Sequence, residues 1–315
     1  MNIWDELPKP FFVLAPMDDV TDTVFRRVIA ACAPPDLFFT EFVNVDALQS
    51  RGRESTLKRL RFTDTECPII AQVWGLNPEN FKKSAADIAE LGYAGIDLNF
   101  GCPVKDVVQN GACSALIKPE NWGRAAEMIQ ACREGAPTLP LSVKTRLGFN
   151  EVDYGWHEFL LKQTLNALTI HGRTRKQMSK VPADWAAMEP IVRLRTSLSP
   201  STKIIGNGDV LTRAQGEELA TKHGVDGVMV GRGIFHDPFM FDQKSPWEGM
   251  SKEQKIALYR KHVQLFADVW EDGERRVHTL NKFCKIYING FDGAKELRER
   301  LMHANSTEEL LGLLK

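Results

Sequence analysis

The feature that most limits the possible folds of this chain is a regular alternation of short apolar segments with longer stretches of helical periodicity. Between Pro78 and Leu91, for example, Phe81, Ala85 and Ile88 recur at the spacing of one helix face. The apolar segments are nearly continuous, as in parallel strands that helices cover on both faces. They predict eight strands, over Phe11–Met17, Asp36–Phe42, Pro68–Trp74, Gly95–Phe100, Leu139–Leu147, Ala167–His171, Lys203–Gly208 and Gly227–Gly231.

Eight strand-then-helix units in about 240 residues predict a closed (β/α)8 TIM barrel, an α/β fold. An open, doubly wound sheet is the competing architecture. Such a sheet gathers its ligands near one switch point, whereas polar residues follow several strands around this whole series. That distribution favours a barrel whose functional site lies at one rim.

The sequence changes in character after Pro246, where no further strand is predicted. Helical periodicity continues instead, for example over Leu280–Ile288 and Ala294–Met302. We therefore predict a barrel domain over residues 1–243 and a small helical bundle over residues 244–315.

Composition excludes several classes of protein. With 315 residues, 43% of them hydrophobic, and a formal net charge of −1, the chain can bury a large core, and its charge alone leaves nucleic acid open as a partner. No apolar run approaches the roughly 18 to 20 residues of a membrane span, and the amino terminus lacks a signal-peptide pattern. The six cysteines lack paired metal-binding spacing, so we expect reduced thiols, no metal, no membrane and a cytoplasmic location.

Two glycine turns follow the last two predicted strands, at residues 206–209 and 231–233. Each could be ordinary strand punctuation. Glycine also lets main-chain N–H groups approach a phosphate closely, and the loops after strands seven and eight are the usual phosphate site of barrels. The pair of turns favours a phosphorylated ligand, held by Asn207, Gly208, Asp209, Gly231 and Arg232.

Cationic or protonatable side chains alternate along two neighbouring strand ends. Lys144 and Arg146 share one face of the fifth strand, and His171 and Arg173 follow the sixth with the same spacing. They could reach solvent or pair with carboxylates. If they converge at the rim, they suit an anionic or electron-rich ligand such as a flavin. Gln72 offers an amide to that ligand or is a satisfied polar group inside the barrel.

Cys102 lies between Gly101 and Pro103, where a strand leaves the core. A single cysteine is often a small buried hydrophobic residue, but burial at such a turn should be incomplete. A thiol with a reference pKa near 8.5 stays largely protonated at neutral pH, so it can donate a proton.

These segments resemble one known family, the flavin-dependent tRNA-dihydrouridine synthases. Its most specific motifs are Asn-x-Gly-Cys-Pro at residues 99–103 and His-Gly-Arg-Thr at residues 171–174. The matching segments cover the barrel in the order of the family: Ala15-Pro16-Met17, Thr40-Glu41, Gln72 with Gly75, Asp97–Pro103, Asn110-Gly111, Ser142–Arg146, His171–Thr174, Asn207–Asp209 and Gly231–Gly233.

The resemblance implies that NADPH reduces bound FMN, and that the reduced flavin reduces the C5–C6 double bond of a D-loop uridine in tRNA. Hydride from flavin N5 would reach C6, and Cys102 would protonate C5 from the other side of the ring. The uridine must then be drawn out of the folded tRNA into the pocket. Which uridine is chosen is left open, and a monomer is the simpler expectation.

The resemblance also assigns roles to individual residues. Asn99, Arg146 and Arg173 would face the uracil or nearby tRNA, and Lys282 and Lys285 would contact tRNA phosphates from one helix face. That helix face could equally be an ordinary solvated one. The residues that would hold the cofactor are Ala15, Pro16, Met17, Gln72, Lys144, His171, Asn207, Gly208, Asp209, Gly231 and Arg232.

Two positions depart from the family pattern. Cys113 stands where relatives commonly carry glycine, and residues 179–182 replace an aromatic-containing loop. Three alternatives to the tRNA reductase remain: an FMN barrel acting on a free pyrimidine or small enone, a noncatalytic RNA-binding protein, and a Schiff-base aldolase using Lys144. The helical tail argues against the first, and the set of Cys102, Lys144 and His171 against the second. An aldolase gives no role to Cys102.

Overall fold

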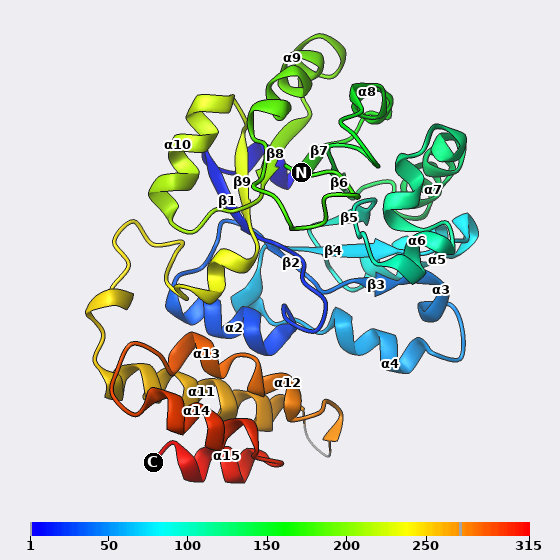
Figure 1. Cartoon of the computed structure of the whole chain (residues 1–315). Helices are drawn as coiled ribbons and strands as arrows, with labels where there is room; N and C mark the ends of the chain where they lie inside the picture. Colours follow the sequence, from blue (N-terminus) through cyan, green and yellow to red (C-terminus); the bar gives the residue numbers. More distant parts are fainter. Residues whose placement is uncertain (1, 271–272) are drawn as a thin grey trace.

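The computed structural model describes residues 2–270 and 273–315, and it shows parallel strands enclosed by a ring of helices (Figure 1). The strands are β1 (Phe11–Leu14), β2 (Phe38–Phe39), β3 (Val43–Asn44), β4 (Ile69–Trp74), β5 (Gly95–Asn99), β6 (Leu141–Arg146), β7 (Ala167–His171), β8 (Lys203–Asn207) and β9 (Gly227–Val230).

The sheet closes on itself. Its order is β1-β9-β8-β7-β6-β5-β4-β2, with β3 also paired to β4, and a parallel bridge between Val13 and Leu37 joins β1 to the segment that enters β2. This closure confirms the predicted barrel and excludes the open, doubly wound sheet. The carboxyl ends of all the strands therefore meet at one rim.

The predicted second strand, Asp36–Phe42, is wrong in its extent, because only β2 forms within it and β3 begins after it, at Val43. At the break, the Thr40 hydroxyl accepts a hydrogen bond from the main-chain N–H of Gln72 at 3.0 Å, so a side chain replaces a main-chain partner in the ladder. Glu41, the next residue, is fully buried.

The helices around the barrel follow the predicted alternation. The helix expected at Pro78–Leu91 is α5 (Pro78–Glu90); Asn77 caps its first turn, and Phe81, Ala85 and Ile88 are buried as predicted. The others are α1 (Ile3–Glu6), α2 (Thr23–Cys32), α3 (Val45–Leu48), α4 (Arg53–Leu57), α6 (Lys105–Gln109), α7 (Trp122–Gly135), α8 (Tyr154–Leu161), α9 (Glu189–Leu198) and α10 (Arg213–His223).

The chain after the barrel forms helices that gather beside α2 (Figure 1). The stretch predicted as one helix, Leu280–Ile288, is in fact two short helices, because a chain of successive turns keeps the same apolar spacing as one helix. Leu280, Phe283, Cys284 and Tyr287 are all buried on this spacing. The α-helices within the described part of this tail are α11 (Lys252–Val269), α12 (His278–Asn281), α13 (Cys284–Tyr287), α14 (Ala294–Met302) and α15 (Thr307–Leu313).

The helical domain is joined to the barrel by both apolar and polar contacts. Phe25 of α2 stacks on Phe283 with ring centroids 4.9 Å apart, and the Trp270 indole donates a hydrogen bond to Asp22. Arg275 forms ion pairs with Glu41 at 2.9 Å and with Asp22 at 3.2 Å, and both carboxylates are buried. The two parts therefore share a buried interface, and the predicted boundary between residues 243 and 244 stays a prediction.

Replacing Arg275 with methionine should lower the free energy of unfolding by about 3 kcal/mol, because Asp22 and Glu41 would lose a cation while staying buried. Urea unfolding measures the change. The matched control is the exposed neighbour, Arg276→Met, which should cost little. Equal losses of unfolding free energy in the two variants would contradict a stabilising role for the buried ion pairs of Arg275.

No helix among the described residues is both long enough and apolar enough to cross a membrane.

Candidate active site

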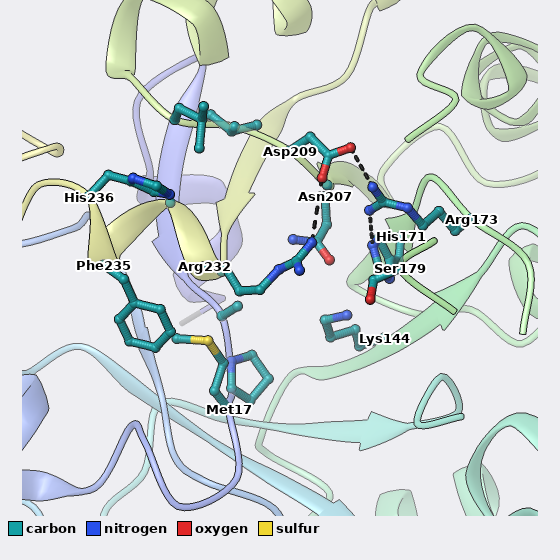
Figure 2. A pocket seen from close by; sticks show the side chains of 17 residues that line it. Met17, Lys144, His171, Arg173, Ser179, Asn207, Asp209, Arg232, Phe235 and His236 are labelled. Carbon is teal, nitrogen blue, oxygen red and sulfur yellow. Dashed lines mark hydrogen bonds and ion pairs between the residues drawn. The ribbon is translucent and has the colours of Figure 1, made fainter. Parts of the chain in front are cut away.

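The carboxyl-terminal rim of the barrel contains a cavity of about 530 Å³, between the ends of β1, β6, β7, β8 and β9 (Figure 2). Sequence analysis singled out most of the residues in its wall, and the structure brings them together. The wall consists of Ala15, Pro16, Met17, Lys144, His171, Arg173, Ser179, Asn207, Gly208, Asp209, Val210, Leu211, Gly231, Arg232, Gly233, Phe235 and His236.

Lys144 supplies a cation to the wall of this cavity. Burial and, to a lesser extent, the neighbouring Arg146 together lower the pKa of its ammonium to about 8, and the buried Asp97 opposes part of this shift. The ammonium is therefore held in surroundings that disfavour its charge. An anionic ligand in the cavity would relieve that cost.

His171 lies beside Lys144 and is neutral across the physiological pH range. Burial, followed by the nearby Lys144, Arg146 and Arg173, holds the pKa of its imidazole far below the ordinary value. Arg173 Nη1 lies 3.1 Å from His171 Nε2, and a guanidinium can only donate. Nε2 is therefore the acceptor, and Nδ1 carries the proton.

The carboxylate of Asp209 is paired with the arginine side chains of the cavity wall. Its carboxylate accepts a hydrogen bond from Arg173 and lies 3.7 Å from Arg232 Nη2, as Figure 2 shows. Hydrogen bonds, ion pairing and the charges of both arginines hold the pKa of Asp209 below its usual value despite partial burial. The carboxylate thus stays ionised and orients both guanidinium groups.

The two glycine turns, at residues 206–209 and 231–233, lie where the main chains of two loops approach each other closely. A Cβ on Gly233 would lie 2.0 Å from the Val210 carbonyl oxygen, so only glycine permits this approach of the two loops. A Cβ on Gly231 would meet only Ala15, at 3.8 Å, and would project into open space beside the cavity. Arg232 and Gly233 begin a short 3₁₀ helix, so their N–H groups have no partner within it and can donate to a ligand.

A chain of buried hydrogen bonds runs below the cavity to the Cys102 turn. Ser142 and Gln72 donate to the two oxygens of Asp97, at 2.6 Å and 2.7 Å. Asn99 donates to Gln72 at 3.0 Å and accepts from the main-chain N–H of Cys102 at 3.0 Å. The chain fixes the orientation of both amides and, through Asn99, the position of the turn.

Burial raises the pKa of Asp97 to about 6, and its two hydrogen bonds and Lys144 partly offset that rise. The sequence left open whether Gln72 contacts a ligand or is a satisfied polar group inside the barrel. Gln72 is fully buried, and its side-chain carbonyl and one of its N–H groups form hydrogen bonds within the protein. The second N–H group is left for a ligand.

Cys102 lies in the wall of a second cavity of about 380 Å³ at the same rim, together with Cys113, Asp18, Arg59 and Trp74. It is partly exposed, as expected for the turn. A hydrogen bond from Cys113 lowers the pKa of the Cys102 thiol to about 7, although burial opposes this, and Arg146 adds to the lowering. The thiol is therefore more acidic than the sequence implied, and its pKa is close to the value that suits proton transfer near neutral pH.

This pKa predicts a pH dependence for any step in which Cys102 donates a proton. Below pH 7 the thiol is protonated, and above it the acid form falls about tenfold per pH unit. In single-turnover assays with pre-reduced enzyme, the rate of uridine reduction should be level at low pH and fall above about pH 7. Cys113→Gly should move that fall to higher pH, and an unchanged profile in this variant would contradict the assigned cause.

Arg146 and Arg173 are held by main-chain carbonyl groups. Arg146 donates from Nε to Gly101 at 2.7 Å and from Nη1 to Met178 at 2.9 Å, and Arg173 donates from Nε to Val181 at 2.6 Å. Both are buried. Arg173 therefore attaches the altered loop at residues 179–182 to the rim, and Arg146 holds Met178, the residue just before that loop.

Lys282 and Lys285 lie in the helical domain and are not among the residues that line either cavity. The Lys282 ammonium donates to the main-chain carbonyl of Asp19 in the barrel, and Lys285 on α13 is exposed. The two lysines therefore have different surroundings, and of the two Lys285 is the better candidate for contact with an external phosphate.

Several residues of the site were not singled out from the sequence. Phe235 and His236 reach the cavity through the short 3₁₀ helix that begins at Arg232, which was not predicted from the sequence. Asp97 carried a signal, since a carboxylate in the middle of an apolar strand is unusual.

Fold and site together define a parallel (β/α)8 barrel with a cationic rim cavity beside an acidic thiol. Solved structures with related folds include 2-naphthoyl-CoA reductase (TM-score 0.57, 11% identity, 77% of this chain and 50% of the other), a Rhizobium histamine dehydrogenase (0.55, 14%, 84% and 51%) and a morphinone reductase variant (0.52, 9%, 73% and 85%). At these identities the likeness supports the fold alone.

The sequence profile of the dihydrouridine synthase (Dus) family matches residues 13–315, so the chain belongs to that family of flavin-dependent oxidoreductases. A probable tRNA-dihydrouridine synthase of Staphylococcus aureus (strain Mu50) is 48% identical over 317 residues, covering 99% of this chain and 94% of its own. Probable tRNA-dihydrouridine synthase 2 of Bacillus subtilis (strain 168) is also 48% identical, covering 99% and 95%. This confirms the resemblance seen in the motifs.

Proposed function

We propose that this protein reduces uridine in the D-loop of tRNA to dihydrouridine, using FMN as its bound cofactor and NADPH as reductant. The observation that carries the proposal is the position of the acidic Cys102 thiol at the same rim as the cationic cavity. A cytoplasmic location and a monomeric state are part of the same proposal.

The cavity residues suit FMN in size and chemistry. The N–H groups of Arg232 and Gly233, with the Arg232 guanidinium, would hold the phosphate, and the open space beside Gly231 leaves room for it. Ala15, Pro16 and Met17 would line the flavin ring, while Lys144 and the Nδ1–H of His171 offer donors to its polar edge. Gln72 has one remaining N–H for the same purpose.

When bound, the flavin would supply the hydride. Cys102 would supply the proton, because its thiol is partly exposed and its pKa of about 7 keeps a large fraction protonated at neutral pH. Asn99 and Arg146 hold the turn that carries this thiol, through the Cys102 N–H and the Gly101 carbonyl. Their roles in contacting uracil, and that of Arg173, belong to this proposal as well.

The helical domain would bind the tRNA backbone. Lys285→Glu should weaken tRNA binding measured by filter retention, with a smaller dependence on salt, and leave flavin content unchanged. The exposed α10 residue Lys222→Glu is the matched control. Equal binding by the two variants would contradict this role of Lys285. Deleting residues 251–315 is a poorer test, because it would expose Phe25 and leave buried Glu41 without Arg275.

Lys144 gives a specific reason to consider amine catalysis, since a pKa of about 8 leaves part of it unprotonated. An aldolase would be colourless and would be trapped by borohydride with its carbonyl substrate. A flavoprotein would be yellow and would release FMN on denaturation.

The direct experiment incubates purified protein with NADPH and an unmodified tRNA transcript, and then measures dihydrouridine in the tRNA. Dihydrouridine at a D-loop position is the expected result. Reduction of free uridine at the same rate, independent of the tRNA, would favour the small-substrate alternative. Flavin-free protein without product would favour the noncatalytic one.

A further inference from the structure

The wall of the second cavity contains two thiols, those of Cys102 and Cys113. The main-chain N–H of Ser114 donates to the Cys102 carbonyl at 3.3 Å, so the backbone segments that carry the two cysteines are joined directly. Hydrogen bonding from the Cys113 thiol is also the main cause of the lowered pKa of Cys102. A disulfide requires Cα atoms within about 7 Å and sulfur atoms about 2.05 Å apart, and this main-chain link favours that approach.

The backbone at Cys113 is better suited to glycine than to cysteine. Its φ of 51° lies in the left-handed region, where a Cβ costs about 1 kcal/mol. Glycine would adopt this conformation freely. A cysteine at such a position should contribute through its side chain, and its thiol shares a cavity wall with that of Cys102.

The two thiols are chemically unequal. Cys102 is partly exposed and its pKa of about 7 gives a substantial thiolate fraction, whereas Cys113 is buried and its pKa lies well above the usual value. Cys102 is therefore the thiol that meets an oxidant first. Cys113 is placed to react with the oxidised Cys102.

We propose that Cys102 and Cys113 form a redox modification site, which hydroperoxides convert into an intramolecular disulfide and dithiols reopen. The Cys102 thiolate attacks one peroxide oxygen, forming sulfenic acid as the O–O bond breaks. Cys113 then attacks that sulfur, the S–S bond forms and water leaves. With hydrogen peroxide, two thiols lose two electrons and two protons, and two molecules of water result.

The consequence for activity rests on the proposed function. A disulfide removes the proton donor but leaves the FMN cavity residues, such as Lys144 and Arg232, in place. Uridine reduction should stop while NADPH still reduces the flavin. The disulfide also protects Cys102 from irreversible oxidation to sulfinic acid.

The experiment treats full-length flavin-loaded protein with hydrogen peroxide, blocks free thiols with N-ethylmaleimide and maps peptides by mass spectrometry. The expected result is a peptide pair joined through Cys102 and Cys113 and abolished by prior dithiothreitol. Uridine reduction should fall about 10²-fold, as for loss of the acid, and return after dithiothreitol. Absence of the joined peptides would overturn the proposal.

Cys113→Gly tests the second thiol without adding strain, and Cys113→Ser retains a hydrogen-bonding group. Both variants should lack the joined peptides and recover on the order of tenfold less activity after excess peroxide and dithiothreitol. Recovery equal to that of the unaltered protein would overturn the protective role. The peptide measurement needs no activity, so joined peptides in a protein that never makes dihydrouridine would refute the proposed function and leave the modification site standing.

Discussion

Replacing Cys102 with alanine should slow the formation of dihydrouridine by about 10²-fold or more, the range typical of a lost general acid. The flavin should remain bound and reducible by NADPH, because the side chain of Cys102 lies in the second cavity and not in the wall of the first. Single-turnover product formation and bleaching of the flavin absorbance measure the two steps separately.

Cys67→Ala is the matched control for this substitution. Cys67 is exposed and precedes β4, at the opposite end of the barrel from the site, so its removal should leave both steps unchanged. Undiminished product formation by Cys102→Ala would refute the role of this thiol. Loss of flavin in the variant would instead indicate that Cys102 supports the cavity.

Replacing Lys144 with methionine should slow NADPH-driven reduction of the flavin on the order of 10²-fold, and FMN should bind more weakly. The side chain keeps its apolar length but loses the cation that faces the cavity, and a charge held in a desolvated site stabilises negative charge strongly. Stopped-flow measurement of flavin bleaching and equilibrium dialysis of FMN test the two effects.

Lys203→Met provides the comparison, because Lys203 begins β8 at the opposite rim and pairs there with Asp5 at 2.8 Å. It should change neither flavin reduction nor FMN affinity. Equal rates in Lys144→Met and the unaltered protein would show that the cation at residue 144 is not needed for reduction.

Most of the cavity could be predicted because its residues lie at strand ends, where sequence order also gives order around the rim. Lys144, His171 and Asn207 follow this rule, and the structure places all three in one wall. Phe235 and His236 could not be predicted in this way, because they lie beyond the strand end and reach the cavity through the 3₁₀ helix Arg232–Phe235.

The protonation states of the site residues were the property hardest to predict from the sequence. The reference pKa of a thiol gave no hint that Cys102 would be lowered to about 7, since the cause is a hydrogen bond from Cys113. His171 was counted as a protonatable group, but burial among cations keeps it neutral. Both effects depend on distances between residues that are far apart in the chain.

The sequence by itself determined the barrel, the family and the order of the site residues, because strand periodicity and turn chemistry are local properties. Only the tertiary structure decided which groups are charged, which amides are already satisfied and which thiol faces Cys102. Those properties follow from burial and from contacts across the rim, and these exist only once the sheet has closed.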